Sequence, residues 1–188
     1  MTDYRSVLIA NRGEIAVRVN KACRELGIKT IQVYSDADID SLAVKMSDEA
    51  ICIGPAVSAK SYLNIDNILA AAKSSGADAI HPGYGFLAEN SEFASAVESS
   101  GIKFLGPSSQ AIKLLGDKVS ARELVSSLNV ATVPGSDGRV SDLSHAQVLA
   151  KDIGFPLMIK ASAGGGGRGI RPVYNEDDLV RYFPQASA

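Results

Sequence analysis

The chain has 188 residues, 46% of them hydrophobic, and a formal net charge of -2 at pH 7. This length allows one or two domains with their own cores. The charge gives no electrostatic reason to expect nucleic acid or an anionic membrane as a partner. No apolar run approaches the roughly 18 residues of a membrane span, and residues 1–5 do not have the pattern of a signal or transit segment. We therefore expect a soluble, cytoplasmic protein.

The cysteines and histidines lack the spacing of metal ligands. Cys23 and Cys52 lie in segments with an apolar period, so we expect both to be reduced core residues. His81 and His145, the only histidines, show no ligand spacing either. No metal site is therefore predicted in this chain, and His81 is interpreted as a structural residue at a strand end rather than as a base.

The first 105 residues alternate between strand-like and helix-like patterns. Five short apolar runs are typical of strands covered on both faces: 6–10, 28–34, 50–53, 77–81 and 102–105. Helical periodicity between these runs predicts an α/β fold with an open parallel sheet, in which ligands bind at the carboxyl ends of the strands. The turns 11–13 and 81–85 should lie at that edge.

Local signals predict the faces and limits of the helices. The buried face of the first helix is predicted from one apolar stripe: Ile15, Val19, Ala22 and Leu26. Gly27 and Gly76 are expected to end helices, since glycine readily adopts the left-handed conformation of a helix end. Asn90 is expected to cap the helix that carries Phe93, Ala94 and Val97.

The rest of the chain has a different order of elements. Helices are predicted over four stretches: 108–115, 118–128, 145–153 and 176–182. The loop 134–138 is rich in turn residues and is a candidate domain boundary. Two apolar runs, 155–159 and 170–174, predict a hairpin, and Pro184 should disturb the last helix.

A glycine-rich segment joins the two strands of this hairpin. Lys160 ends the entering strand, and five glycines surround Arg168 within residues 164–169. Glycine lets backbone N–H groups approach a polyphosphate closely, and the two basic residues add charge for the same anion. A flexible linker is the alternative, but linkers are not usually bracketed by strands and basic residues. We therefore interpret the segment as a phosphate-covering loop.

The chain ends soon after this loop. An isolated hairpin with one helix on either side buries too little surface to be stable alone. The acidic residues that follow, Glu176, Asp177 and Asp178, are typical of a helix start rather than of a magnesium site. We therefore expect the chain to be a fragment of a larger enzyme.

Four motifs carry a family resemblance: I-A-N-R-G-E-I-A at 9–16, H-P-G-Y-G-F-L at 81–87, G-D-K at 116–118, and K-A-S with the glycines at 160–169. In order and spacing they resemble the amino-terminal part of biotin carboxylase, the ATP-grasp component of the biotin-dependent carboxylases. The resemblance implies a Rossmann-like, pre-ATP-grasp domain over residues 1–115. It also implies the truncated start of an ATP-grasp lid domain over 116–188.

The resemblance also implies an activity for the full-length protein. Members of this family are ligases that use MgATP to activate bicarbonate, through a carboxyphosphate-type intermediate, and transfer the carboxyl group to biotin on a carrier protein. The implied setting is an acyl-CoA carboxylase, with acetyl-CoA as the favoured acceptor and fatty acid biosynthesis as the pathway, although propionyl-CoA, pyruvate and urea carboxylases share the component. A carboxyltransferase and a second copy of the enzyme are the other implied partners.

The nucleotide site is implied by two lysines and three glycines. Lys118 and Lys160 would contact ATP, and Gly165, Gly166 and Gly167 would close over its phosphates. Without the resemblance, Lys118 would be interpreted as an ordinary surface charge at a helix start. The family's magnesium ligands, general base and bicarbonate-binding residues lie farther along its sequence, so no catalytic residue is assigned here and the chain alone is expected to be inactive.

Two further pairs of residues match family positions. Tyr84 and Gly85 would face the biotin and bicarbonate pocket, although Tyr84 could instead be a loop aromatic packed on the sheet. Lys21 and Glu25 match positions at the family's dimer contact. Because they are four apart on a helix, they could also form an ordinary surface pair.

Two other functions stay open. Gly13 opens a helix after the first strand and Asp36 follows at a distance close to that of the ribose-binding acid in nicotinamide-dependent oxidoreductases, but the expected fingerprint has three glycines rather than one. The chain could also be a nucleotide-binding or dimerising remnant without catalytic activity.

Overall fold

Two compact units, Met1–Gly116 and Asp117–Ala188, make up the chain. The computed structural model describes residues 4–116, 118–136, 138–160 and 170–187. The boundary between the units differs from the one suggested by the turn-rich loop 134–138, which lies inside the second unit.

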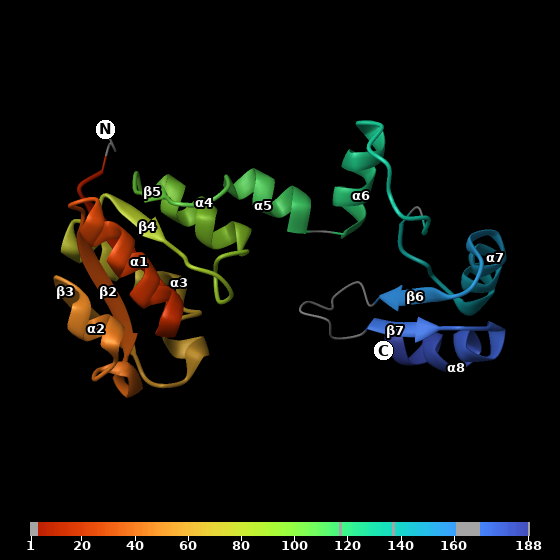
Figure 1. The fold of residues 1–188 in the computed structure, drawn as a ribbon, viewed down its shortest axis with the longest axis horizontal. Helices are drawn as coiled ribbons and strands as arrows, with labels where there is room; N and C mark the ends of the chain where they lie inside the picture. The colour runs from red at the N-terminus through yellow and green to blue at the C-terminus, as the bar shows by residue number, and fades with distance from the viewer. Residues whose placement is uncertain (1–3, 117, 137, 161–169, 188) are drawn as a thin grey trace. The chain divides into compact units, whose positions relative to one another are not determined.

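A five-stranded parallel sheet forms the centre of the first unit (Figure 1). Its strands lie in the order β3-β2-β1-β4-β5, and every neighbouring pair is parallel. The strand bounds are β1 Ser6–Ile9, β2 Lys29–Ser35, β3 Glu49–Gly54, β4 Ala79–His81 and β5 Lys103–Phe104. The open parallel sheet predicted from the sequence is therefore confirmed.

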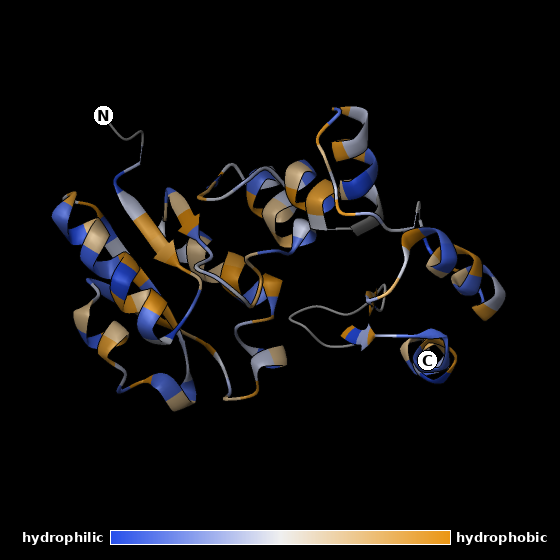
Figure 2. Cartoon of the chain, turned by 45° about the vertical axis from the view of Figure 1, so that its right-hand side comes forward, coloured by the Kyte–Doolittle hydropathy of each residue, from blue (hydrophilic) through white to orange (hydrophobic). Residues whose placement is uncertain are grey.

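Helices cover both faces of this sheet. Their bounds are α1 Gly13–Glu25, α2 Leu42–Met46, α3 Ile65–Ser75, α4 Ser91–Ser99 and α5 Ser109–Gly116, with short 3-10 helices η1 Asp36–Asp38 and η2 Ser58–Lys60. Side chains alternate along β1, so that Val7 and Ile9 pack with residues of α1 and α2, whereas Leu8 packs with residues of α3 and α4. Both faces of the strands are thus buried, which explains the hydrophobic colour of the central strands in Figure 2.

The buried face of α1 differs from the predicted stripe. The residues of α1 that are buried are Ala16, Val19, Asn20 and Cys23. Leu26 is 68% exposed because it lies beyond the last residue of the helix, and Ala22 is exposed as well. Val19 and Ile15 of the predicted stripe do pack on the inner side, so the stripe was predicted correctly in part, but the buried face also contains a polar residue, Asn20.

The predicted helix limits agree well with the structure. The side chain of Asn90 accepts a hydrogen bond of 2.8 Å from the backbone N–H of Phe93 and so caps α4. Gly76 ends α3 in the left-handed conformation, with φ of 64°. The predicted inner residues of α4, including Phe93, are fully buried. The short helix α2 was not predicted.

The two cysteines have different environments. Both are free, and Cys23 is buried on the inner face of α1, where burial raises the pKa of its thiol. Cys52 is exposed, so its prediction as a core residue was wrong. It lies on β3, an edge strand, and the apolar pattern of a strand does not reveal which strands lie at an edge.

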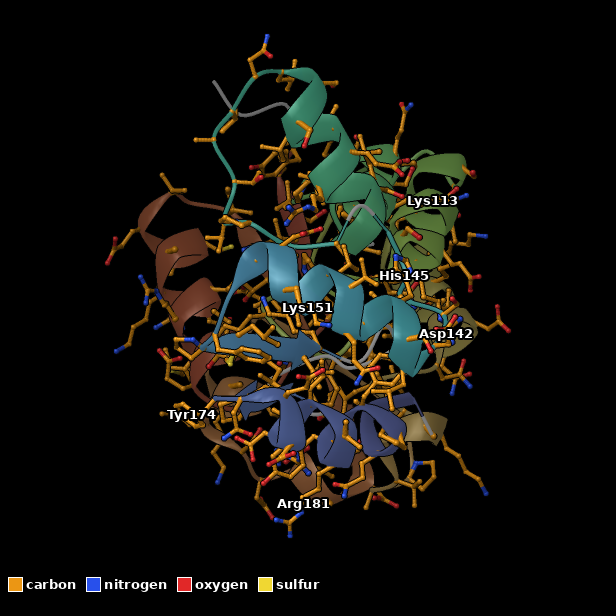
Figure 3. All side chains as sticks on the ribbon, turned by 90° about the vertical axis from the view of Figure 1, so that its right-hand side faces the viewer. Lys113, Asp142, His145, Lys151, Tyr174 and Arg181 are labelled. Atoms are coloured by element: carbon orange, nitrogen blue, oxygen red, sulfur yellow. The ribbon has the colours of Figure 1, made fainter. Side chains whose placement is uncertain are left out.

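The second unit contains the predicted hairpin. Its elements are α6 Lys118–Ser127, α7 Leu143–Ile153, β6 Leu157–Lys160, β7 Ile170–Val173 and α8 Glu176–Ser187. β6 and β7 are antiparallel, with Leu157 opposite Val173 and Lys160 opposite Ile170. The core of this unit contains residues of α7, α8 and both strands, and Figure 3 shows Asp142 and His145 together at the start of α7.

Pro184 does not end the last helix. α8 continues to Ser187 with Pro184 inside it, beyond the end predicted at residue 182. A proline removes one backbone hydrogen bond of a helix but does not prevent the following residues from keeping helical dihedral angles.

Among the described residues, no helix is long and apolar enough to cross a membrane.

The cap at Asn90 leads to a prediction about stability. Asn90→Ala removes the acceptor for the Phe93 N–H and should lower the free energy of unfolding by about 1 kcal/mol. Asn90→Gly should cost only a few tenths of that amount, because glycine is also accepted at this position. Urea unfolding followed by circular dichroism measures both variants, and equal losses would contradict the role of the side chain.

Candidate functional site

The ends of β1 and β4 bring together two chain segments that are distant in sequence. Ile9 pairs with His81, and the backbone N–H of Ala10 donates to the carbonyl of His81 at 2.9 Å. The turn that starts α1 and the loop after β4 therefore leave the sheet side by side, as predicted. We define residues 82–90, which join β4 to α4, as the β4 loop.

The side chain of Asn11 ties these two segments together. It is 3% exposed, and its Nδ2 donates hydrogen bonds of 2.8 Å to the carbonyls of Pro82 and Tyr84. Its Oδ1 accepts from the backbone N–H of Arg12 at 2.9 Å. The backbone carbonyl of Asn11 accepts from Nε2 of Gln32, a buried residue of β2, at 2.6 Å. One buried amide thus fixes the path of the β4 loop.

Two glycines give the β4 loop its tight turn. Gly83 and Gly85 have φ of 67° and 66°, in the left-handed region that favours glycine. A Cβ atom on Gly83 would lie 2.6 Å from Nδ2 of Asn11, whereas a Cβ on Gly85 would meet nothing within 4 Å. Gly83 is therefore required for close approach as well as for conformation.

Tyr84 lies on the outside of this loop. Its side chain is 62% exposed, and its hydroxyl donates a long hydrogen bond of 3.3 Å to Oε2 of Glu14 in the first turn of α1. The alternative that Tyr84 packs on the sheet is therefore wrong. An exposed aromatic ring beside an exposed glycine is available to contact another molecule.

His81 has a structural role at the end of β4. Its Nδ1 accepts a hydrogen bond of 2.9 Å from the backbone N–H of Gly83, and burial lowers the pKa of its imidazole. A neutral ring matches this acceptor role, in agreement with the structural interpretation made from the sequence.

A second polar cluster lies at the same edge and is centred on Asp38. Its carboxylate accepts from Nε of Arg12 at 2.8 Å, from Nη2 of the same guanidinium, from the hydroxyl of Tyr62 at 2.7 Å and from Oγ of Ser35 at 3.1 Å. The backbone N–H of Ser35 donates to the Tyr62 hydroxyl at 2.9 Å. Asp38 therefore connects the start of α1, the end of β2 and the segment before α3.

The hydrogen bonds of this cluster favour an ionised Asp38 and a protonated Tyr62. The hydrogen bonds from Arg12, together with those from Tyr62 and Ser35, lower the pKa of Asp38 to about 2. Burial, followed by the hydrogen bond to Asp38, raises the pKa of Tyr62 to about 12. At neutral pH the aspartate is thus ionised and the phenol is protonated, which is the combination that the observed hydrogen bonds require.

The ring of Tyr62 also contacts the β4 loop. It stacks on the ring of Phe86 with centroids 5.1 Å apart and an interplanar angle of 21°. Phe86 follows Gly85 directly and has φ of 38°, which is uncommon for a bulky residue. The cluster centred on Asp38 therefore reaches the segment that carries Tyr84 and Gly85.

The sequence alone did not identify this cluster. Asp36 was the acid considered for a ribose contact, yet it is exposed, and it is Asp38 that faces the start of α1. The acidic loop after the second strand was the available signal, and Phe86 lies in the motif at 81–87, but nothing in the sequence indicated its contact with Tyr62, because that contact depends on the tertiary fold. The described residues contain no group of three or more His, Cys, Asp or Glu that could hold a metal ion.

The other predicted site residues lie on α1, in the second unit or outside the described residues. Lys21 and Glu25 are exposed on α1, and among the described residues no ion pair joins them. Lys21 lines a groove between α1 and α2. In the second unit, Lys160 is exposed at the end of β6, next to the glycine-rich segment.

Part of the predicted nucleotide site is not described. Gly165, Gly166 and Gly167 lie outside the described residues, as does the side chain of Lys118. For the described part of the chain, the structure thus brings Tyr84 and Gly85 together with Asn11, and it places Lys160 within the second unit.

An open parallel sheet covered by helices, followed by a second unit of helices and a hairpin, places the chain in the α/β class, in which ligands commonly bind at the carboxyl ends of the strands. Comparison with known proteins gives two family models. The biotin carboxylase N-terminal domain matches residues 3–112, and the ATP binding domain of the carbamoyl-phosphate synthase L chain matches residues 117–188.

Individual relatives agree with these models. Biotin carboxylase of Haemophilus influenzae is 60% identical over 183 residues, which are 97% of this chain and 41% of that protein. The mitochondrial propionyl-CoA carboxylase alpha chain of Rattus norvegicus is 50% identical, with 98% of this chain and 26% of the relative covered. The chain therefore spans about two fifths, or less, of the length of these curated relatives.

A solved structure supports the same assignment. It is the biotin carboxylase domain dimer of 2-oxoglutarate carboxylase from Hydrogenobacter thermophilus, in complex with MgADP, ADP and bicarbonate. It has a TM-score of 0.92 and 50% identity, and the match covers 99% of this chain and 41% of that one. The chain belongs to the biotin carboxylase family.

The two glycines of the β4 loop provide a matched pair of variants. Both Gly83→Ala and Gly85→Ala place a side chain at positive φ, which should cost about 1 kcal/mol each. Gly83→Ala should cost at least about 1 kcal/mol more, because its Cβ would collide with the buried Asn11 side chain. Equal losses in urea unfolding would show that the contact with Asn11 does not restrict this position.

The low pKa of Asp38 predicts a pH dependence of stability. A carboxyl with a lower pKa in the folded state stabilises the fold above its unfolded pKa, and this contribution is lost as the pH falls from about 4 to about 2. Asp38→Asn should therefore be less stable than wild type at pH 5, with the difference shrinking by about 1 to 2 kcal/mol by pH 2.

Urea titrations at several pH values measure this difference. Asp40→Asn is the matched control, since this side chain is exposed in the same acidic loop. Its Oδ1 lies 3.9 Å from Nζ of Lys45, in a surface ion pair that should contribute little to stability. Asp48 and Asp78 also have lowered pKa values and contribute to the pH dependence of the wild-type protein. The contribution of Asp38 is therefore obtained from the difference in the free energy of unfolding between wild type and Asp38→Asn. A constant gap between wild type and Asp38→Asn would contradict the prediction.

Proposed function

We propose that this chain supplies the N-terminal domain and the start of the ATP-grasp domain of a biotin carboxylase. The whole enzyme would be an ATP-dependent ligase that carboxylates biotin, held on a carrier protein, with bicarbonate. The observation that carries this proposal is the match of two successive family models to the two compact units of the chain, 3–112 and 117–188. The dimer with MgADP and bicarbonate from H. thermophilus supports the same choice of ligands.

Each unit would have its own task. In the first, the β4 loop would present the exposed ring of Tyr84 and the backbone of Gly85 to biotin and bicarbonate, with Asn11 holding the loop in place. In the second, the ammonium group of Lys160 would bind ATP at the end of β6, together with Lys118 and the backbone of Gly165, Gly166 and Gly167. Bound MgATP would supply the phosphoryl group that activates bicarbonate.

The partners follow from the same assignment. The enzyme would act with a biotin carboxyl carrier protein and a carboxyltransferase, in the cytoplasm, and would form a homodimer in which Lys21 and Glu25 of α1 contact the second copy. The exposure of both side chains is compatible with this contact. We expect no catalytic group in this chain, and activity would require the rest of the family's length.

The acceptor is a finer proposal. We propose acetyl-CoA, which would place the enzyme in fatty acid biosynthesis. The support is the greater identity to the biotin carboxylase of H. influenzae, 60%, than to the propionyl-CoA carboxylase alpha chain, 50%. The carboxyltransferase chooses the acceptor, so an assay of the assembled carboxylase with acetyl-CoA and propionyl-CoA tests this point. Faster carboxylation of propionyl-CoA would overturn it.

The nucleotide site can be tested on the chain itself. Lys160→Ala should weaken MgATP binding about tenfold, because it removes a charged partner of the phosphates. Lys21→Ala, an exposed lysine on α1 in the other unit, is the matched control and should bind as wild type does. Calorimetric titration measures both, and equal effects would reject the assignment of Lys160.

The same titration tests how much of the site this chain contains. Binding only by a version extended with the rest of its gene would mean that ATP needs residues beyond this chain. Tight binding of NADH without binding of ATP would reject the proposed function and favour an oxidoreductase.

A further inference from the structure

The backbone of Phe86 is the feature that the proposed function does not explain. Its φ of 38° lies in the left-handed region, which a bulky side chain adopts only when its surroundings hold it there. Phe86 is also 37% exposed, so burial of its ring in a core does not account for this conformation. It directly follows Tyr84 and Gly85, the residues proposed to face biotin and bicarbonate.

Tyr62 is the neighbour that holds Phe86. Its ring stacks on that of Phe86, and Tyr62 itself is 2% exposed and fixed at its far end by two hydrogen bonds. Its hydroxyl donates to Asp38 at 2.7 Å and accepts from the backbone N–H of Ser35 at 2.9 Å. A tyrosine held at both ends is a rigid support for the ring stacked against it.

Tyr62 is connected through Asp38 to the turn 11–13, which also holds the β4 loop. Asp38 is bound by both Nε and Nη2 of Arg12, and the residue before Arg12 is Asn11, whose amide binds the carbonyls of Pro82 and Tyr84. The loop is thus held before Gly85 by the hydrogen bonds of Asn11 and after Gly85 by the ring of Tyr62. A shift of either support would move the segment between them.

We propose that Asp38, Tyr62 and Phe86 are positioning residues that set the place of Tyr84 and Gly85. None of the three would contact a reacting atom. They would act through the backbone of the β4 loop, so that their loss alters recognition of biotin and bicarbonate while recognition of ATP is unchanged. The effect on recognition of biotin and bicarbonate rests on the proposed function, whereas the effect on the loop does not.

Hydrogen exchange tests the effect on the loop without assuming any activity. Within the β4 loop, the N–H of Ala88 donates to the carbonyl of Gly85 at 2.8 Å and that of Asn90 to the carbonyl of Leu87 at 3.0 Å. In Phe86→Ala these amides should exchange about tenfold faster relative to the amides of β1, since loop opening becomes easier. An unchanged ratio of loop to β1 exchange would overturn the proposal.

Phe104→Ala is the matched control. It also removes a phenylalanine ring in the first unit, but that ring lies in the core and pairs edge-on with Phe93 at 5.9 Å, whereas the ring of Phe86 pairs with Tyr62. This variant should speed exchange throughout the unit and leave the ratio of loop to β1 exchange unchanged. A selective effect of Phe104→Ala on the loop would mean that the loop responds to general loss of stability, and would overturn the role of Phe86.

Steady-state kinetics on the whole protein encoded by the gene test the catalytic consequence. Phe86→Ala should raise the KM for bicarbonate and for biotin about fivefold and leave the KM for ATP within about twofold of wild type. Phe86→Tyr keeps the stacked ring and should restore wild-type values, and Tyr62→Phe should have an effect in between, because it keeps the ring but loses both hydroxyl contacts. Equal changes in all three KM values would overturn the positioning role.

The two proposals fail in different ways. Absence of ATP-dependent carboxylation of biotin by the wild-type whole protein would reject the proposed function, and the exchange ratio would then decide the role of Phe86 by itself. Normal carboxylation by wild type together with unchanged KM values in Phe86→Ala would reject the positioning role and leave the proposed function standing.

Discussion

The pairing of β1 with β4 is the constraint on which the candidate site at the carboxyl edge of the sheet depends. These strands are adjacent in the sheet although about 70 residues separate them, and their register places Ile9 opposite His81. Both strands therefore end at the same level, which brings Asn11 within reach of the carbonyls of Pro82 and Tyr84. A change of register by one residue would turn these groups away from each other and leave a buried amide without its acceptors.

The polar groups buried at this edge give it a single conformation. An unpaired buried amide or carboxylate costs about 1 to 3 kcal/mol or more, so a different path of the loop that leaves Asn11 or Asp38 without partners is strongly disfavoured. In the observed arrangement Asn11 has partners at both side-chain atoms, and the carboxylate of Asp38 accepts from three residues. Hydrophobic burial holds the sheet together, whereas these directional bonds determine where its loops go.

Local patterns in the sequence predicted most of the fold and less of the site. The strands, the cap at Asn90 and the left-handed end of α3 follow from signals within a few residues, and all were predicted correctly. The burial of Cys52 was predicted wrongly because strand order, which makes β3 an edge, is a property of the whole sheet. Tyr84 and Gly85 were assigned to the candidate site through a family motif, whereas Asp38 and Tyr62, which are proposed to support them, are brought together only by tertiary folding.

The exposure of Tyr84 explains why its supports matter. A side chain that is 62% exposed and bound through one long hydrogen bond to Glu14 is held weakly by its own contacts. Its place is determined through the backbone instead, by Asn11 on one side and by the strained Phe86 on the other. This arrangement leaves the ring of Tyr84 uncovered while its Cα stays fixed. Under the proposed function, the ring of Tyr84 would thereby be both accessible and well placed, because the residues that fix its backbone would not be the residues that touch the ligand.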